Sequence, residues 1–451
     1  MHSFQTVFDP IPGLPELIEQ EGEDHFASFR RDRLAFFLRL PQAIGDIGLV
    51  RFGLLPGVVV SAPEPILEVL SDRAADYIKS PLISMYLLPL IGDGILASEG
   101  ASHKRHRRIV APAFQARRVL AYADAMVEET VRHVERWGRR VDIAKEMTAL
   151  TLRIVARSLF GTASSRDHAV LHQGFIEAGQ ILAHLMQEEL PVKDEVALEK
   201  GRQLKRTVAD LDEVVTRLID ERKSSAARPP DVMSMLLDAR DEDSTAGLDA
   251  KELRDEVMTL FLAGHETTAN ALSWAWQLIA DHPEVEARFL EEVDTVLAGK
   301  LPSAADLERL PYTSAVFKET LRLYPPVYFT ARQAKTPTPI GAFTIPAGMS
   351  VFINIAGLHR RPELFEDPER FRPERFVSEA NFSRGAYLPF GAGPRFCPGN
   401  HFSTLEGVLV LATIAQRVSL IRRAGPAEVE PLITLRPRGA VWMNAARRPS
   451  A

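Results

Sequence analysis

Residues 389–400 read PFGAGPRFCPGN and contain Cys397, the only cysteine among the 451 residues of the chain. The glycines of this segment let the backbone turn tightly and approach another group closely. A helix is predicted over 400–417, directly after the cysteine, and a helix N-terminus stabilises a nearby thiolate. A lone cysteine is more often an inert buried side chain, so it is the glycine-rich frame that favours a thiolate ligand here.

A second polar segment lies inside a long apolar helix. Asp249 and Glu252 have the spacing of a capping box, and Pro283 ends the pattern, which predicts a helix over 249–282. The middle of this helix, residues 263–268, reads AGHETT. A glutamate in such surroundings is costly unless it has a partner, so the segment is either a functional site or a helix kink with a hydrated polar face.

Three further charged patterns are ambiguous when each is taken alone. Glu319 and Arg322 share one face of a helix predicted over 312–324, which equally suits a surface ion pair. Residues 371–376 read FRPERF. Residues 103–107 read HKRHR, which equally suits a solvated basic turn.

Together these segments resemble the cytochromes P450. The haem-binding loop of that family reads F-G-x-G-x-R-x-C-x-G, and residues 390–399 match all six fixed positions. The other segments match the family patterns A/G-G-x-D/E-T, E-x-x-R, F-x-P-E-R-F and H-x-x-x-R, and the resemblance extends from about residue 48 to residue 443. Two positions depart from the usual pattern: Pro398 replaces an aliphatic residue, and Ser403 replaces an alanine.

The resemblance implies haem b as the cofactor, with Cys397 as the axial thiolate ligand of its iron. It assigns contacts with the haem and its propionates to Arg395, His103, Arg107, Arg332 and Phe390. It also implies two catalytic residues on the long helix. Thr267 matches the hydroxyl that steadies dioxygen, and Glu266 matches the acid that relays protons. His265 occupies the variable position of the pattern and receives no role.

Family position further implies a structural triad and a substrate pocket. The buried triad, which would stiffen the proximal side of the haem, consists of Glu319, Arg322 and Arg375. The pocket residues are mostly apolar: Leu96, Leu182, Met186, Ala263, Val327, Phe329, Ile433 and Thr434. Because none of them is charged, we expect a lipophilic substrate, namely a fatty acid, terpenoid, steroid or polyketide. The sequences AGHETT (263–268), ETLRLYPP (319–326) and PERF (373–376) are most similar to the fatty-acid-hydroxylating branches of the family, which slightly favours a fatty acid.

The implied fold is mainly α with small β-sheets, the triangular helical prism of the cytochrome P450 fold, as a single domain over residues 1–451. Residues 48–60 predict two strands around a turn at 55–57, and residues 338–356 predict further strand and loop. Strands and helices do not alternate in a βαβ pattern, which argues against a doubly wound sheet.

The implied reaction inserts one oxygen atom of O₂ into a C–H or C=C bond, giving hydroxylation or epoxidation, with two electrons from NAD(P)H. Since the lone cysteine is assigned to haem, we expect the electrons to come from separate proteins, a ferredoxin and its ferredoxin reductase. Lys104, Arg105 and Arg108 suit either a docking surface for an acidic partner or an ordinary solvated face.

The bulk composition limits partners and compartment. The net charge of −6 gives no sign of a nucleic-acid-binding protein, and one cysteine excludes an intrachain disulfide. The first 26 residues lack the apolar run of a membrane anchor or signal peptide. We therefore expect a cytoplasmic monomer without a membrane anchor.

Two alternative functions remain open. One is a haem-thiolate isomerase, dehydratase or peroxygenase that needs no external electrons, although such relatives tend to lose the acid–alcohol pair that Glu266 and Thr267 preserve here. The other is a non-catalytic haem-binding sensor, which has no need for that pair. Failure to consume NADPH with any reductase would identify the sensor.

Overall fold

The computed structural model describes residues 11–19, 24–52, 55–161, 165–185, 195–240, 247–377, 382–423 and 425–448. The chain forms two compact units. Unit 1 consists of residues 1–84, 322–370 and 381–397, and unit 2 of residues 85–321, 371–380 and 398–451. Two helices have residues in both units, α4 (Pro81–Ile91) and α14 (Pro311–Leu323). The single domain expected from the sequence stays a prediction.

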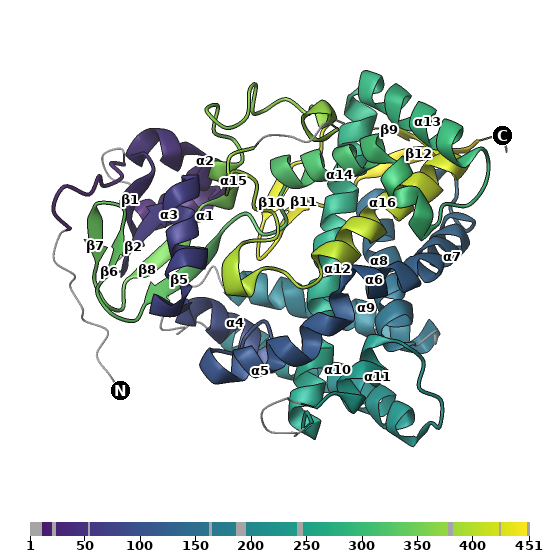
Figure 1. Ribbon diagram of the computed structural model, residues 1–451, viewed down its shortest axis with the longest axis horizontal. Coiled ribbons are helices and arrows are strands. Elements are labelled where there is room, and N and C mark those ends of the chain that lie inside the picture. Colours follow the sequence, from purple (N-terminus) through teal and green to yellow (C-terminus); the bar gives the residue numbers. More distant parts are fainter. Residues whose placement is uncertain are drawn as a thin grey trace. The chain divides into compact units, whose positions relative to one another are not determined.

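Unit 1 is built on a five-stranded sheet with the order β1-β2-β8-β5-β3. Strands β2 and β8 are parallel, and the other pairs are antiparallel (Figure 1). The strands are β1 (Ile47–Phe52), β2 (Leu55–Val60), β3 (Tyr77–Lys79), β5 (Thr330–Ala334) and β8 (Ser350–Ile353), and β6 (Thr338–Ile340) pairs with β7 (Phe343–Ile345). The helices are α1 (His25–Arg31), α2 (Arg33–Ile44), α3 (Pro63–Leu67), α15 (Ile355–Leu358), the π-helix η1 (Glu68–Asp72), and the 3₁₀-helices η2 (Ala74–Asp76) and η7 (Gly393–Arg395).

The turn predicted at residues 55–57 is wrong, because these residues already belong to β2. Gly57 pairs with Val50 across the ladder. A Cβ atom at Gly57 would come within 2.4 Å of the Phe352 ring, so the glycine makes room for an aromatic side chain rather than for a turn. The valines and isoleucines of β2 and β8 are fully buried and form the core of unit 1.

Unit 2 is mainly helical, as the sequence predicted. Its helices are α5 (Gly100–Val110), α6 (Ala116–Val119), α7 (Ala123–Val134), α8 (Ile143–Phe160), α9 (Ser165–Leu185), α10 (Glu195–Ser224), α11 (Val232–Asp238), α12 (Ala250–Asp281), α13 (Pro283–Leu297) and α16 (Asn400–Arg417). Short 3₁₀-helices are η3 (Ala111–Phe114), η4 (Leu120–Tyr122), η5 (Ala304–Arg309) and η6 (Pro373–Phe376). Strands β4 (Arg140–Asp142), β12 (Trp442–Arg447) and β9 (Val418–Arg422) form one sheet, and β10 (Val429–Pro431) pairs with β11 (Leu435–Pro437).

Helix α12 is the central element of unit 2, with α8, α10, α13, α16 and strands β9 and β11 packed against it (Figure 1). It spans 32 residues and begins at a capping box in which the Asp249 side chain accepts from the backbone of Glu252. The predicted limits of this helix are confirmed. Those of α14 and α16 are confirmed as well, α16 to the residue.

Among the described helices, we find none that combines the length and the apolar character needed to cross a bilayer.

Replacing Asp249 with Ala should remove the capping box and lower the free energy of unfolding by about 1 kcal/mol. Urea unfolding followed by circular dichroism measures this cost. Glu291→Ala is the matched control, since Glu291 is an exposed acidic residue inside the neighbouring helix α13. Equal stabilities of the two variants would show that the cap contributes nothing.

Candidate active site

Cys397 lies at the end of a loop in unit 1 that its own backbone holds closed. The Cys397 amide donates to the Phe390 carbonyl at 3.0 Å, and the Phe396 amide donates to the Gly393 carbonyl at 3.0 Å. Cys397 is not part of a disulfide and is half-buried. The loop therefore carries the thiol of Cys397 on a fixed backbone.

Gly393 explains how this loop is seated within unit 1. Its φ angle is +69°, and a Cβ atom there would lie 1.9 Å from the Leu70 carbonyl oxygen. An L side chain is excluded both by the backbone conformation and by this contact. The glycine thus lets the loop lie directly on the π-helix η1.

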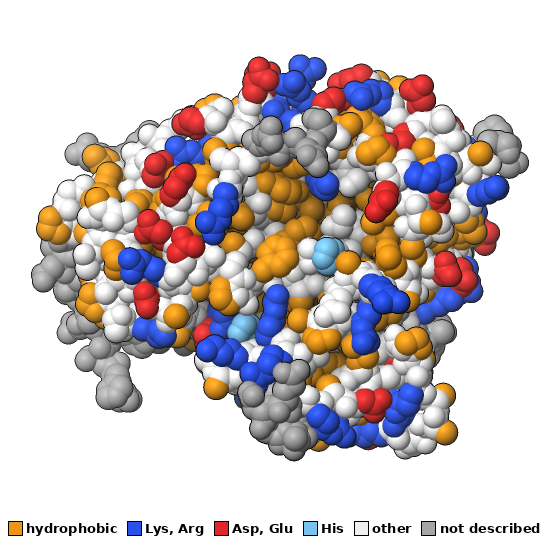
Figure 2. Space-filling view, in the orientation of Figure 1, with side chains coloured by type: hydrophobic (Ala, Val, Ile, Leu, Met, Phe, Trp, Pro, Cys, Tyr) orange, Lys and Arg blue, Asp and Glu red, His pale blue; other side chains and the backbone are white. Residues whose placement is uncertain are grey.

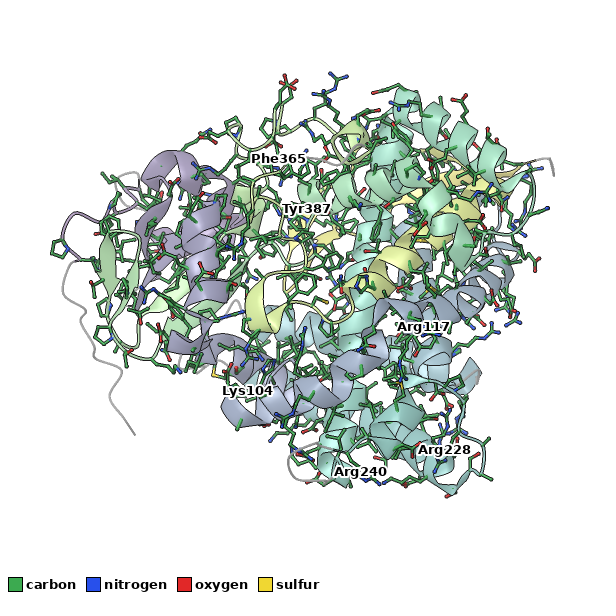
Figure 3. All side chains as sticks on the ribbon, viewed as in Figure 1. Lys104, Arg117, Arg228, Arg240, Phe365 and Tyr387 are labelled. Atoms are coloured by element: carbon green, nitrogen blue, oxygen red, sulfur yellow. The ribbon has the colours of Figure 1, made fainter. Side chains whose placement is uncertain are left out.

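His359 holds the other end of the loop. Its Nε2 atom accepts from the Leu388 amide at 2.9 Å. Burial, with the nearby Arg322 as a smaller cause, lowers the pKa of His359 to about 3, so the ring is neutral and can act as this acceptor. Tyr387 and Phe365 lie beside the ring, with centroids 5.4 and 6.4 Å from it (Figure 3). The segment before the cysteine is therefore anchored in a packed aromatic setting.

The side chains around Cys397 fit an iron that is already bound in a cofactor rather than a bare metal ion. Among the described residues, no three His, Cys, Asp or Glu side chains gather in a way that could hold a bare metal ion. A single thiolate is what haem requires from the protein at one axial position. Phe390 and Phe396, which flank the thiol, are half-buried and offer apolar surface to a flat group.

The predicted propionate partners occur in both units. In unit 1, Arg332 lies on β5, where its Nη1 atom donates to the Ala331 carbonyl at 3.0 Å, and Arg395 ends η7. In unit 2, His103 and Arg107 lie one turn apart on α5 and so share a helix face. These cationic or donor side chains have the chemistry that carboxylates need.

The two predicted catalytic residues lie at the middle of α12. The Thr267 hydroxyl donates to the Ala263 carbonyl one turn earlier, at 2.9 Å. Glu266 accepts a hydrogen bond from the Thr434 hydroxyl at 2.6 Å. Gly264 permits close packing of α8, since a Cβ atom there would lie 3.1 Å from a Val155 methyl group. The AGHETT segment is therefore a packed helix with partnered polar groups.

His265, which received no role, is a packing residue. It is buried, its Nδ1 atom lies 2.5 Å from the Phe261 carbonyl oxygen, and its ring lies 5.4 Å from that of Phe175. Burial lowers the pKa of His265, which keeps the ring neutral.

Two residues of the predicted triad, Glu319 and Arg322, are fully buried, and the Arg375 side chain is 7% exposed. In unit 2, Glu319 accepts from Arg375 Nε at 3.3 Å and from the Arg372 amide at 2.9 Å. In unit 1, the Arg322 guanidinium donates to the carbonyls of His359 at 2.9 Å and Pro368 at 2.7 Å. In unit 2, these bonds attach the FRPERF segment to Glu319 of α14. In unit 1, they attach His359 and Pro368 to Arg322.

The predicted pocket residues have varied environments. Ala263, Leu96 and Val327 are exposed, Ile433 is half-buried, and Leu182 is buried. Phe329 stacks on Phe37 at 4.6 Å within unit 1, and Met186 lies outside the described residues. Thr434 is buried, and its hydroxyl is committed to Glu266. Its place in the substrate pocket stays a prediction.

The suggested docking residues also need one correction. Lys104 and Arg108 are exposed on α5, where Figure 2 shows basic side chains gathered and Figure 3 labels Lys104. Arg105 instead pairs with Glu252 and donates to the Gly247 carbonyl at 2.6 Å. Its guanidinium is therefore occupied within unit 2.

Glu406 was not identified from the sequence. This residue of α16 is completely buried, and neither of its carboxyl oxygens has a hydrogen-bond partner among the described residues. Burial raises the pKa of Glu406 well above 4.5, and the nearby Thr268 opposes this only in part. Thr268 also lies 3.1 Å from the Ser403 hydroxyl, at one of the two departures from the family pattern. A glutamate inside the apolar run of residues 405–414 is the signal that could have revealed it.

Comparison with known proteins gives a consistent result. The family model described as "Cytochrome P450" matches residues 25–441. Cyclooctatin synthase of Streptomyces melanosporofaciens is 37% identical over 402 residues, covering 87% of this chain and 86% of the relative. Cyclooctat-9-en-7-ol 5-monooxygenase of the same organism is 36% identical over 406 residues, with coverage of 87% and 86%.

Two further similarities extend over more of the chain. Pentalenene oxygenase of Streptomyces avermitilis is 31% identical over 424 residues, covering 91% of each chain. The crystal structure of the cytochrome P450DA heme domain is similar with a TM-score of 0.89 and 26% identity, covering 97% of this chain and 98% of that one.

Replacing Glu406 with Gln should change how stability depends on pH. Above pH 4.5 the unfolded carboxyl ionises while the folded one keeps its proton, so the folded state binds more protons and its stability falls as pH rises. Glutamine removes this loss. The urea midpoint of the variant should therefore gain on the wild type between about pH 5 and about pH 8.

Glu291→Gln, at an exposed position of α13, is the control and should leave the pH dependence unchanged. Parallel pH profiles for wild type and Glu406→Gln would show that Glu406 ionises normally in the folded protein.

Proposed function

Since the chain belongs to the cytochrome P450 family, whose members are haem b monooxygenases, we propose that this enzyme oxidises a lipophilic terpenoid with O₂ and electrons supplied by separate redox proteins. The observation that carries the proposal is the loop of residues 390–399, which matches the family motif and presents the chain's only thiol from a closed backbone.

When bound, the haem supplies activation of O₂ and transfer of one oxygen atom to the substrate. Cys397 would be the thiolate ligand, and its position before α16 favours the ionised sulfur. Arg332, Arg395, His103 and Arg107 would bind the two propionates, because they offer donors and positive charge to carboxylates.

Glu266 and Thr267 would deliver protons. A carboxyl group can accept and release a proton, and the adjacent hydroxyl can pass it on. Both side chains have partners within unit 2, Thr434 for Glu266 and the Ala263 carbonyl for Thr267. The proton path would therefore begin from ordered side chains.

The relatives support a terpenoid over a fatty acid. The names of the three Streptomyces relatives refer to cyclooctatin, to an alkenol and to pentalenene, and none of the three refers to a fatty acid. The residues assigned to the pocket include no charged group that would bind a fatty-acid carboxylate. We therefore replace the slight preference for fatty acids with a cyclic terpenoid hydrocarbon or its hydroxylated derivative.

The cysteine count supports a separate electron supply. An iron–sulfur cluster needs several cysteine ligands, and this chain has one. A ferredoxin with its reductase would provide the electrons. Lys104 and Arg108 are exposed basic residues with which an acidic partner could pair.

The test of the haem–thiolate assignment is the absorption spectrum of the reduced protein with carbon monoxide. The wild type should show the long-wavelength Soret band after which the family is named, and Cys397→Ala should lose it because no other thiol can replace the ligand. A band that survives in Cys397→Ala would refute Cys397 as the ligand.

The test of the substrate class is a titration of the oxidised protein with matched probes. Cyclooctat-9-en-7-ol and pentalenene, compared with a saturated fatty acid of similar carbon number, should shift the Soret band at lower concentration. Tighter binding of the fatty acid would contradict the terpenoid assignment while leaving the haem assignment intact.

A further inference from the structure

Glu266 has a partner that no family pattern predicts. The Thr434 hydroxyl, which lies in the turn between β10 and β11, is 2.6 Å from Glu266 Oε1. The two residues are 168 positions apart in the chain and belong to the same unit. Thr434 is 5% exposed and Glu266 is half-buried, so the bond is partly shielded from bulk water.

A second hydrogen bond at Thr434 identifies its hydroxyl as the donor to Glu266. Asn270 Nδ2 donates to Thr434 Oγ1 at 3.0 Å. An amide NH₂ group can only donate, so the threonine oxygen accepts there and its single proton is available for Glu266. Asn270 lies one turn after Glu266 on α12, which places both side chains on the same helix face.

The hairpin that carries Thr434 is itself attached to α12. Trp274 Nε1 donates to the Leu435 carbonyl at 3.2 Å. Arg436 bonds to Glu430 across the hairpin at 2.7 Å. The Thr434 hydroxyl is therefore bonded to two side chains of α12, and the hairpin that carries it is attached to the same helix.

We propose that Thr434 is a positioning residue for proton delivery, which holds Glu266 as an ordered carboxylate and sets how readily it hands on a proton. The proposal rests on the proposed function, because Glu266 is assigned to proton delivery there. Glu266 has to leave Thr434 before its carboxylate can turn elsewhere.

The other titratable groups near this part of α12 are uncharged or paired. Burial lowers the pKa of His265 and raises that of Glu406 on α16, so both shifts favour the uncharged side chain. On the hairpin, Glu430 and Arg436 bond to each other. Helix α8 places Thr151 and Val155 against this part of α12, and neither ionises.

The first test uses the haem-loaded protein with a plant-type ferredoxin, its reductase and NADPH, and follows the pH dependence of peroxide release. Thr434→Val has nearly the same shape as threonine but lacks the donor, which makes the charged form of Glu266 less favourable. The midpoint of the pH profile should move up by about one pH unit, the size expected for one hydrogen bond to a charged group.

Two controls separate the hydroxyl from packing. Thr434→Ser keeps the donor and should retain the wild-type midpoint. Thr413→Val removes an equally buried hydroxyl on α16, which donates to the Leu409 carbonyl at 2.6 Å, and should also leave the midpoint unchanged. The proposal is overturned if Thr434→Val behaves like Thr413→Val, or if Thr434→Ser moves as far as Thr434→Val.

A second test does not depend on electron transfer. In a double-mutant cycle of urea unfolding, Thr434→Val should lower the midpoint in the wild-type background and have a smaller effect beside Glu266→Ala, where its partner is already absent. Equal effects of Thr434→Val in both backgrounds would refute the proposal that Thr434 positions Glu266. A missing carbon monoxide band in the wild type would instead refute the proposed function, and the cycle would still decide whether Thr434 holds Glu266.

Discussion

The interaction on which the rest of the site depends is the pairing of polar side chains in the middle of α12 with partners from neighbouring elements. Unpaired, such a group loses its hydration without compensation. Asn270 and Glu266 both form hydrogen bonds with Thr434 of the hairpin, and Thr268 forms one with Ser403 of α16. The same bonds that stabilise unit 2 therefore orient the groups assigned to chemistry.

The thiol loop of unit 1 is held by different means. Its order comes from backbone bonds, from a glycine that leaves room for the Leu70 carbonyl, and from a neutral histidine that accepts the Leu388 amide. These contacts fix the backbone on either side of Cys397, which is half-buried as a residue. A metal ligand benefits from this arrangement, because the chain does not have to rearrange when it binds.

Local patterns predicted the elements and motifs well. Capping residues and proline determined the limits of α12, and the glycine-rich motif identified Cys397. Contacts between distant segments were not predictable in this way. The bond from Thr434 to Glu266 spans 168 positions, and a wall residue and a positioning residue look alike in sequence. The burial of Glu406 and the pairing of Arg105 depend on helix packing, and the misplaced turn at Gly57 depends on an aromatic ring from another strand.

The presence of one cysteine in the chain has a consequence for oxidative damage. A cysteine oxidised to the sulfenic acid is commonly rescued when a second thiol condenses with it to form a disulfide, which a reductant then opens. This chain has no second cysteine to do so. Once the sulfur is oxidised, repair has to come from a thiol of another molecule, and further oxidation to the sulfinic acid ends ligation for that copy of the protein. Whatever covers the sulfur therefore also protects it.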